Sequence, residues 1–317
     1  MYARHIVAAV IVTFVGALSG PLCAQSGEEH PSVSFSTGHV TREHSYQVDG
    51  RVRPLLFWIR KSNVGDGRIT WRTGPDGTVG YELLIGTNPA RTPRRINRWG
   101  YLREESTPQG GTVFGVMSQS DEQSIEEAEK NTGRAAEVVH TFKALHQQVT
   151  GSEARVTLSR VRVGKDLTYA DLGMLLAALP EAASQSKVVP IAAWSSPGFL
   201  AATATLIEEG RAAAGRTAKS APPVRVYPYN GQLYELQLQS AERIDRFTRE
   251  TRAFGRAIRG RFRILNLKTR TETPFTVVYG VDGDLTGVPL FISFRPRWWL
   301  EVDCVLSNTP ASAVAIR

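Results

Sequence analysis

The feature that most restricts the fold of this chain is a series of short segments in which apolar and polar side chains alternate. Tight-turn motifs separate these segments. Gly74-Pro-Asp-Gly77 has the composition of a tight reversal, because proline fixes one φ and glycine supplies the positive φ needed elsewhere in the turn. Gly65-Asp-Gly67 and Asn88-Pro89 give similar breaks. Residues 68–71 and 78–85 are therefore predicted to be antiparallel strands, and we assign residues 35–119 to an N-terminal β-meander.

A second strand-rich region covers residues 224–317. Asn230-Gly231 joins predicted strands 224–229 and 232–239, and this dipeptide is the strongest two-residue hairpin signal. Further strands are predicted at residues 275–279, 290–294 and 299–306. Residues 240–260 fit either a helix or a long twisted hairpin, and the pattern leaves both open.

The middle of the chain, residues 120–215, is predicted to be helical with one strand at 155–163. Within residues 120–150, mostly apolar side chains recur every three or four positions, which predicts an amphipathic helix. Two further helices are predicted at 169–179 and 197–214, the second opened by Ser196 as a cap and Pro197 at its first position. The uncharged stretch 188–207 contains two prolines and is expected to be buried rather than to span a membrane. Residues 216–223 predict a linker.

Residues 1–24 have the three regions of a signal peptide. Arg4 precedes an apolar run, Gly20-Pro21 breaks it, and small residues come before Gln25. We expect cleavage after Ala24, a flexible lead over residues 25–34, and an exported protein of the periplasm or outer envelope. A lipoprotein signal with an acylated Cys23 is the alternative, although Pro21-Leu22 fit that chemistry poorly.

Cleavage would leave Cys304 as the single cysteine, so no internal disulfide can form and the core must supply the stability. Cys304 is expected to be a small buried residue on one face of a strand. Loss of Arg4 lowers the formal charge from +8 to +7. Residues 51–103 hold eleven Arg and Lys against three acids, and residues 243–270 ten against two. Such segments attract polyanions, which outside the cytoplasm means lipid head groups and acidic glycans rather than nucleic acid.

The most unusual composition lies between residues 91 and 103, where arginines alternate with aromatic residues. Guanidinium groups pair with anions, and rings stack on apolar or cationic groups. The candidate ligand-binding residues are Arg94, Arg95, Arg98, Trp99 and Tyr101. The alternative is an exposed basic sheet edge that resists aggregation.

Motifs for catalysis or metal binding do not fit this chain. Asp282-Gly-Asp284-Leu-Thr286 matches the D-x-D-x-T pattern of haloacid-dehalogenase phosphatases, but no lysine follows it. The same residues begin like a calcium loop, whose twelfth position would be Ser293 instead of glutamate. A turn between two strands is the preferred interpretation. The histidine spacings do not suit a zinc pair, and G-x-S-x-G and phosphate-loop patterns do not occur. We predict no metal and no cofactor.

Several C-terminal motifs are similar to those of a known protein family. They are Asn230-Gly-Gln-Leu-Tyr-Glu-Leu236, Glu242-Arg-Ile244, the strand 275–279 and Gly287-Val-Pro-Leu-Phe-Ile292, and residues 58–85 add an N-terminal part. Together they resemble a family of uncharacterised exported proteins of Gram-negative bacteria. That family is similar in architecture to lipoprotein carriers, whose curved antiparallel half-barrel opens on an apolar groove. The resemblance implies a carrier-like fold without a catalytic motif.

These observations predict an α+β fold. Its main element is a curved antiparallel sheet, half-barrel-like, in one body or two β lobes, with helices from the middle of the chain packed against the concave face. The expected function is non-enzymatic binding of a lipid or another amphiphilic or anionic envelope component. A hydrolase of envelope polymers and a structural or assembly partner are the alternatives.

Overall fold

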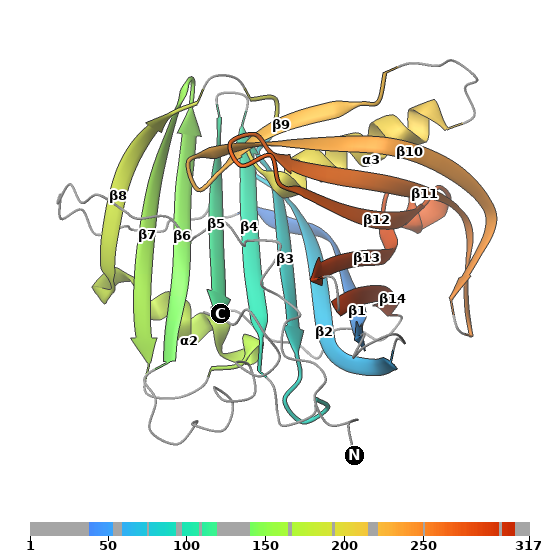
Figure 1. Ribbon diagram of the computed structural model, residues 1–317, viewed down its shortest axis with the longest axis horizontal. Helices are drawn as coiled ribbons and strands as arrows, with labels where there is room; N and C mark the ends of the chain where they lie inside the picture. The colour runs from blue at the N-terminus through green and yellow to red at the C-terminus, as the bar shows by residue number, and fades with distance from the viewer. Residues whose placement is uncertain are drawn as a thin grey trace.

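A computed structural model of the protein describes residues 38–52, 59–74, 76–92, 97–107, 110–118, 140–163, 167–191, 194–214, 221–249, 251–297 and 300–307. One open antiparallel sheet of 14 strands dominates these residues (Figure 1). The strands are β1 (His39–Val52), β2 (Ile59–Thr73), β3 (Val79–Thr87), β4 (Trp99–Thr107), β5 (Gly110–Ser118), β6 (His140–Thr150), β7 (Glu153–Val163), β8 (Ala183–Pro190), β9 (Val224–Tyr229), β10 (Gln232–Arg249), β11 (Arg252–Asn266), β12 (Glu272–Gly280), β13 (Pro289–Arg297) and β14 (Leu300–Ser307).

The strand order consists of two meanders joined at one seam. From the β8 edge the order descends to β1, and from β14 it descends to the β9 edge. The seam is the antiparallel pairing of β1 with β14, in register from Ser45↔Ser307 to Val52↔Leu300. The first and last described strands thus lie in the middle of the sheet, and the two edge strands are consecutive in the chain.

The sheet curls so that its C-terminal meander folds over the N-terminal one. In Figure 1, strands β3 to β8 run from top to bottom, whereas β9 to β12 cross the upper part of the molecule. The β9–β10 turn reaches the face of β6, where the Gln147 side-chain amide donates to the Pro228 carbonyl oxygen at 3.0 Å. The same amide group accepts from the Gly231 N–H at 3.2 Å. One face of the sheet is therefore concave and enclosed.

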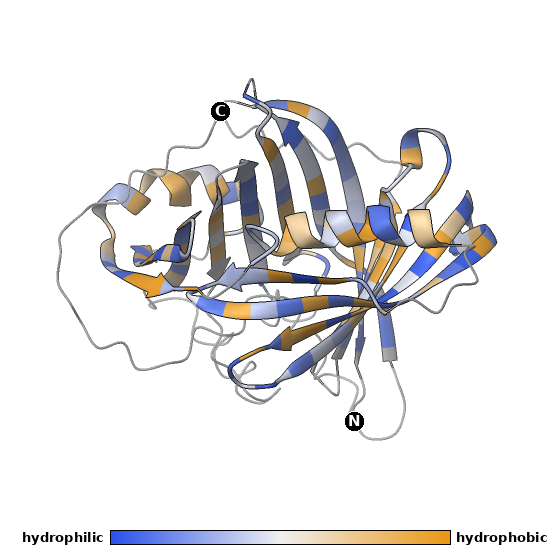
Figure 2. Cartoon of the chain, turned by 90° about the horizontal axis from the view of Figure 1, so that it is seen from above, coloured by the Kyte–Doolittle hydropathy of each residue, from blue (hydrophilic) through white to orange (hydrophobic). Residues whose placement is uncertain are grey.

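Helix α3 (Phe199–Ala213) lies in this concave space. It contacts β9, β10 and β11 on one side and β3 and β4 on the other. Its buried side chains include Phe199, Leu206 and Ile207, spaced by seven and eight residues along one stripe. Figure 2 shows the helix, seen from above, running along the folded-over strands. The helix predicted at 197–214 is confirmed.

The opposite face of the N-terminal meander is covered by a shorter helical segment. It consists of the 3-10 turn η2 (Tyr169–Asp171), α2 (Leu172–Ala177) and η3 (Leu179–Glu181). Leu167, Leu172 and Leu175 are fully buried there. Both faces of β3 to β7 are thus covered. This agrees with the helix predicted at 169–179.

Turn chemistry was a good guide to the hairpins. Asn230 and Gly231 have φ values of 50° and 67°, the conformation of a type I′ turn. Gly77 has a φ of 78° in the turn between β2 and β3. Residues 282–286 form a turn between β12 and β13, with the 3-10 turn η4 (Gly283–Leu285). Residues 240–260 belong to the long β10–β11 hairpin, one of the two alternatives left open.

The amphipathic helix predicted over 120–150 is wrong for its second half, because residues 140–150 form strand β6. Residues 119–139 lie outside the described residues. Phe142 pairs with Val161 on one face, while Val149 pairs with Ala154 on the other. Both faces of β6 carry buried side chains, so apolar residues do not alternate and their spacing imitates a helix. The middle of the chain contributes three strands, β6, β7 and β8, instead of one.

Two further predictions need correction. Gly65-Asp-Gly67 lies inside β2 rather than in a turn. A Cβ at Gly65 would lie 2.0 Å from the carbonyl oxygen of Gly86, so glycine permits close strand approach there. Residues 99–103 belong to β4, which pairs with β3 and β5. They are therefore central in the sheet and not a basic edge.

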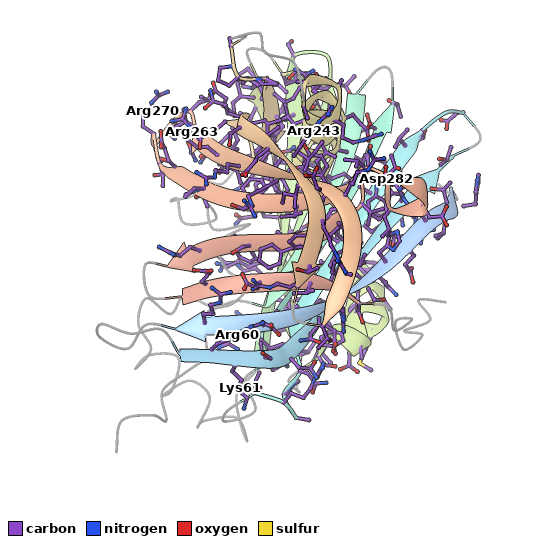
Figure 3. All side chains as sticks on the ribbon, turned by 90° about the vertical axis from the view of Figure 1, so that its right-hand side faces the viewer. Arg60, Lys61, Arg243, Arg263, Arg270 and Asp282 are labelled. Atoms are coloured by element: carbon purple, nitrogen blue, oxygen red, sulfur yellow. The ribbon has the colours of Figure 1, made fainter. Side chains whose placement is uncertain are left out.

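The basic segments are largely neutralised across strands. Arg263 binds Glu272, Arg259 binds Glu242, and Arg256 binds Asp282. Figure 3 shows Arg60 on the N-terminal strands, apart from Arg243, Arg263 and Arg270 on the C-terminal meander. Cross-strand pairing of opposite charges accounts for much of the arginine content. These four side chains do not form one basic patch.

Candidate functional site

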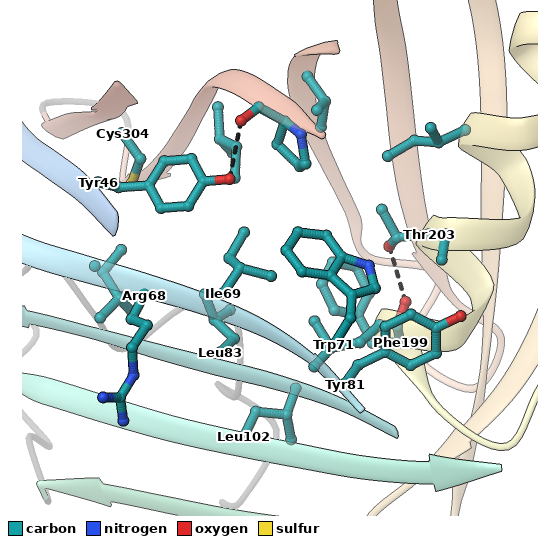
Figure 4. Close-up of a pocket in the computed structure, with 18 of the residues that line it drawn as sticks. Tyr46, Arg68, Ile69, Trp71, Tyr81, Leu83, Leu102, Phe199, Thr203 and Cys304 are labelled. Atoms are coloured by element: carbon teal, nitrogen blue, oxygen red, sulfur yellow. Dashed lines mark hydrogen bonds between the residues drawn. The ribbon is translucent and has the colours of Figure 1, made fainter. Parts of the chain in front are cut away.

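An apolar cavity of about 470 Å³ lies between the concave face of the sheet and α3 (Figure 4). Ligand sites for small molecules span roughly 300–1,000 Å³. The cavity draws its walls from three parts of the chain that are distant in sequence: β1 to β4, helix α3, and β12 to β14. It thus exists only because the C-terminal meander folds over the N-terminal one.

One wall consists of side chains that share the concave face of the N-terminal strands. Ile69 stands opposite Leu83, and Trp71 stands opposite Tyr81, so all four point to the same side of the sheet. Leu83 in turn faces Leu102. Ile69, Trp71, Tyr81 and Leu83 are only partly buried, which is unusual for apolar residues on a face that otherwise holds the core.

The other walls are equally apolar. Val277 pairs with Ile292, which pairs with Cys304 across β12, β13 and β14. Helix α3 adds Phe199, Leu200, Ala204 and Ile207. Phe199 also packs on Phe275, with ring centres 6.0 Å apart. These contacts fix α3 as the roof of the cavity.

Three hydroxyl groups of the cavity lining are already bonded within the protein. The Tyr46 hydroxyl donates to the Pro289 carbonyl oxygen at 2.9 Å. The Thr203 and Thr205 hydroxyls donate to carbonyl oxygens one turn back in α3, those of Phe199 and Ala201. Burial raises the pKa of the Cys304 thiol, so the thiol is neutral and unreactive at ordinary pH. The interior therefore offers mainly contact to apolar groups.

Charged residues lie among the lining residues where the cavity meets solvent. The Arg42 guanidinium lies over the Trp71 ring, 4.5 Å from its centre, and Trp71 also packs edge-on against His44. Arg42 Nη1 donates to the Thr286 carbonyl oxygen at 3.0 Å. Glu208 on α3 lies beside Gly287, since a Cβ there would be 2.8 Å from the Glu208 carboxylate. We call this opening the mouth of the cavity, and we define it by Arg42, Trp71, Thr286, Gly287 and Glu208.

Glu104 on β4 fixes the beginning of α3. Its carboxylate accepts the N–H groups of Leu200 at 2.9 Å and Ala201 at 3.0 Å. A carboxylate at this position meets the free N–H groups and the positive end of the helix dipole. A Cβ at Gly198 would lie 2.4 Å from the Glu104 carboxyl carbon, so glycine is needed for this close approach. The cap predicted at Ser196 is therefore wrong, and the Ser196 N–H instead binds the Val226 carbonyl oxygen.

Burial raises the pKa of Glu104 to about 7, although the backbone donors of α3 oppose the shift. The carboxyl group is completely enclosed, and removing a charge from water costs more than these hydrogen bonds return. Glu104 is thus a titratable group near neutral pH. It positions the roof of the cavity without lining it.

Of the described residues predicted to bind a ligand, Arg98 and Trp99 do not line the cavity. Arg94 and Arg95 are outside the described residues. Arg98 Nη1 donates to the Asn97 carbonyl oxygen. Trp99 is fully buried and donates its ring N–H to the Leu167 carbonyl oxygen at 2.7 Å, on the face opposite the cavity.

Tyr101 is also buried. It contributes to the cavity wall between Gly100 and Leu102, but its ring packs on Phe114 at 6.2 Å between ring centres. Phe114 pairs with Arg103 and therefore shares the face away from Leu102. The structure brings Trp99 and Tyr101 into the core on that face and leaves Arg42 and Trp71 at the mouth.

Sequence reasoning missed Arg42 and Trp71 because they are 29 positions apart in the chain. Arg42 lies near the beginning of β1 and Trp71 near the end of β2, and the β1–β2 register Arg42↔Trp71 puts them side by side at the open end of this hairpin. A hairpin prediction with a fixed register would have shown this pairing. Of the composition-based candidates, Trp99 and Tyr101 lie in β4 and share the face away from the cavity.

Neither a metal-ligand cluster nor a membrane-spanning helix occurs among the described residues. They contain no group of three or more His, Cys, Asp or Glu side chains placed to hold a metal ion. Among the helices of the same residues, none is long and apolar enough to cross a membrane.

Comparison with known proteins adds no relative to this description. The chain matches no protein-family model, no curated protein and no solved structure. The cavity and its mouth therefore provide the basis for a functional proposal.

Proposed function

We propose that the protein binds an amphiphile and holds its apolar chain in the cavity beneath α3. The observation that carries this proposal is the set of partly exposed apolar side chains, Ile69, Trp71, Leu83 and Ile292, around a space of about 470 Å³. Leaving such side chains in contact with water costs free energy, and covering them with an apolar chain returns it.

The surroundings of the cavity favour an amphiphile over a fully apolar ligand. The Tyr46, Thr203 and Thr205 hydroxyls are bonded within the protein, whereas Arg42 and Glu208 place charge at the mouth. An apolar chain inside and a polar group at the mouth satisfy both regions. The signal-like N-terminus supports an exported protein, for which envelope lipids are the available amphiphiles.

A direct test is native mass spectrometry of the protein purified from an envelope fraction. We expect a co-purifying mass that matches a lipid or fatty acid and leaves on activation of the complex. If repeated purifications show no such adduct and added fatty acid does not bind, the proposed function is wrong.

A variant pair tests the location of binding. Ala204 lines the cavity and Ala213 is exposed at the end of the same helix. Ala204→Trp fills the space, so a fluorescent fatty acid should bind at least about 10-fold more weakly, the loss expected when roughly 1.4 kcal/mol of apolar contact is removed. Ala213→Trp should bind like the wild type.

A smaller change guards against a misfolded variant. Leu83→Phe adds less volume, on the cavity wall opposite α3, and should also weaken binding of the fluorescent fatty acid. Equal affinity of the wild type and both cavity variants, each with an unchanged circular dichroism spectrum, would place the bound probe elsewhere on the protein.

A further inference from the structure

Arg42 has hydrogen-bonding capacity that the described part of the chain does not use. A guanidinium group carries five N–H donors in one plane. At Arg42 one nitrogen donates to the Thr286 carbonyl oxygen, and the Trp71 ring covers one face. Both partners are uncharged. The remaining donors are available at the mouth of the cavity.

The charge of Arg42 is also not neutralised by an ion pair. Within the residues that the structure describes, Arg42 has no carboxylate within ion-pair distance, while Arg72, Arg103 and Arg263 each bind at least one. Glu208, the acid that lines the cavity, binds Arg211 one turn further along α3. Because Arg211 pairs with Glu208, the positive charge of Arg42 at the mouth stays without a compensating acid among the described residues.

The surface beside the mouth changes from apolar to charged along one stripe of α3. Leu200, Ala204 and Glu208 follow each other at four-residue intervals and line the cavity. Glu208 then lines a second, polar pocket with Arg211 and Ala212. Arg243 and Arg256 on β10 and β11 border this second pocket, as do Asp245 and Asp282. A ligand with a chain in the cavity would thus have its head in polar surroundings.

We propose that the ligand is an anionic amphiphile and that Arg42 binds its carboxylate or phosphate head. This inference rests on the proposed function and names the class of ligand. Arg42 is suited to the role because a guanidinium binds both oxygens of such a head through two parallel N–H donors. Its stacking on Trp71 holds the group in place. The cation–π contact persists when the Thr286 carbonyl is exchanged for the ligand.

The test compares two probes with the same chain. Hexadecanoic acid and hexadecanol differ in the acidic head alone, and both are measured by displacement of a fluorescent chain from the full-length mature protein. We expect the wild type to prefer the acid at pH 8, with a preference that shrinks as salt increases. Arg42→Gln should weaken acid binding by roughly 10- to 100-fold, as for loss of a charge-assisted hydrogen bond, and should leave the affinity for the alcohol unchanged.

Two control variants isolate the charge. Arg42→Lys keeps the positive charge and should restore part of the preference for the acid. Arg259→Gln removes an arginine that is paired with Glu242 away from the cavity and should bind both probes like the wild type. Dodecyl phosphate should behave like the acid, and millimolar inorganic phosphate should not displace the bound chain.

The outcomes separate this inference from the proposed function. Equal binding of acid and alcohol by both the wild type and Arg42→Gln would overturn the role of Arg42 and leave chain binding intact. Displacement by inorganic phosphate would indicate a free-anion site and would overturn the amphiphile class. Failure of both probes to bind the wild type would contradict the proposed function itself.

Discussion

At the scale of single residues, Glu104 links the stability of the fold to pH. Its pKa is raised by burial from the usual 4.5 to about 7. In the unfolded chain the group titrates near 4.5, so between these two values the folded protein holds a proton that the unfolded protein has released. The resulting stabilisation is complete below pH 4.5 and is lost as the pH rises through 7. The shift corresponds to an effect on the order of 3 kcal/mol.

Glu104→Gln should remove this pH dependence. We expect the difference in free energy of unfolding between wild type and variant to become more favourable to the wild type as the pH falls from 8 to 5. Urea denaturation at several pH values measures this difference. Glu242→Gln, which alters an exposed acid paired with Arg259, is the control and should show no such trend. A difference that stays constant with pH would contradict a raised pKa at Glu104.

Single residues also show where sequence reasoning reaches its limit. Cys304 was predicted to be a small buried residue on a strand face, and it is 4% exposed on β14. That prediction needed only local alternation. The Arg-Glu-Glu run at 103–105 looks like a solvated surface, yet Glu104 alone faces α3. Its role depends on a helix almost a hundred positions later in the chain, and no local pattern reveals that contact.

At the scale of elements, the long β10–β11 hairpin is held by contacts at its tip. Arg249 Nη2 binds the buried Asp303 carboxylate at 2.6 Å, and its guanidinium lies over the Phe291 ring. Arg252 donates to the Leu306 carbonyl oxygen at 2.7 Å. Phe247 stacks between Phe254 and Phe291. The tip thereby packs on the outer face of β13 and β14.

Arg249→Gln should loosen this tip. Burial already raises the pKa of Asp303, and the guanidinium groups of Arg51 and Arg249 oppose that shift. Removing one of them leaves a buried carboxylate poorly compensated, and we expect a loss of about 2 kcal/mol in the free energy of unfolding. Hydrogen exchange should accelerate mainly in residues 244–257. Arg256→Gln, which breaks an exposed pair with Asp282, should change exchange little, and equal effects of the two variants would argue against a special role for Arg249.

Elements with strong local signals were predicted well, and those with mixed signals were not. The Asn230-Gly231 hairpin and the α3 helix are both present because turn chemistry and an apolar stripe are local properties. Strand β6 was mistaken for part of a helix because Phe142 and Val149 are buried on opposite faces. Whether a strand is covered on one face or two is decided by other elements, here the β9–β10 turn and the segment before α2.

At the scale of the whole molecule, the two alternatives were a sheet in one body or in two lobes, and the structure has one continuous sheet. The N-terminal and C-terminal meanders share the β1–β14 seam, and one core cluster includes Val48, Phe114, Leu236 and Phe275 from both. The cavity is built from the same two meanders. Its shape could not be predicted from the sequence, because no short motif specifies how far a sheet of this length curls.

The shared seam predicts a single cooperative unfolding transition. Val48 lies in the middle of β1, is completely buried, and pairs with Cys304 across the seam. Val48→Ala should cost about 2 kcal/mol and lower the midpoint of thermal unfolding by roughly 4–8 °C. Because neither meander can keep its core when the other is lost, tryptophan fluorescence and far-ultraviolet circular dichroism should move together. Val40→Ala, on the same strand but 45% exposed, should leave the midpoint nearly unchanged. Two resolved transitions in the wild type, or a variant that shifts one probe and not the other, would show that the meanders unfold as separate lobes.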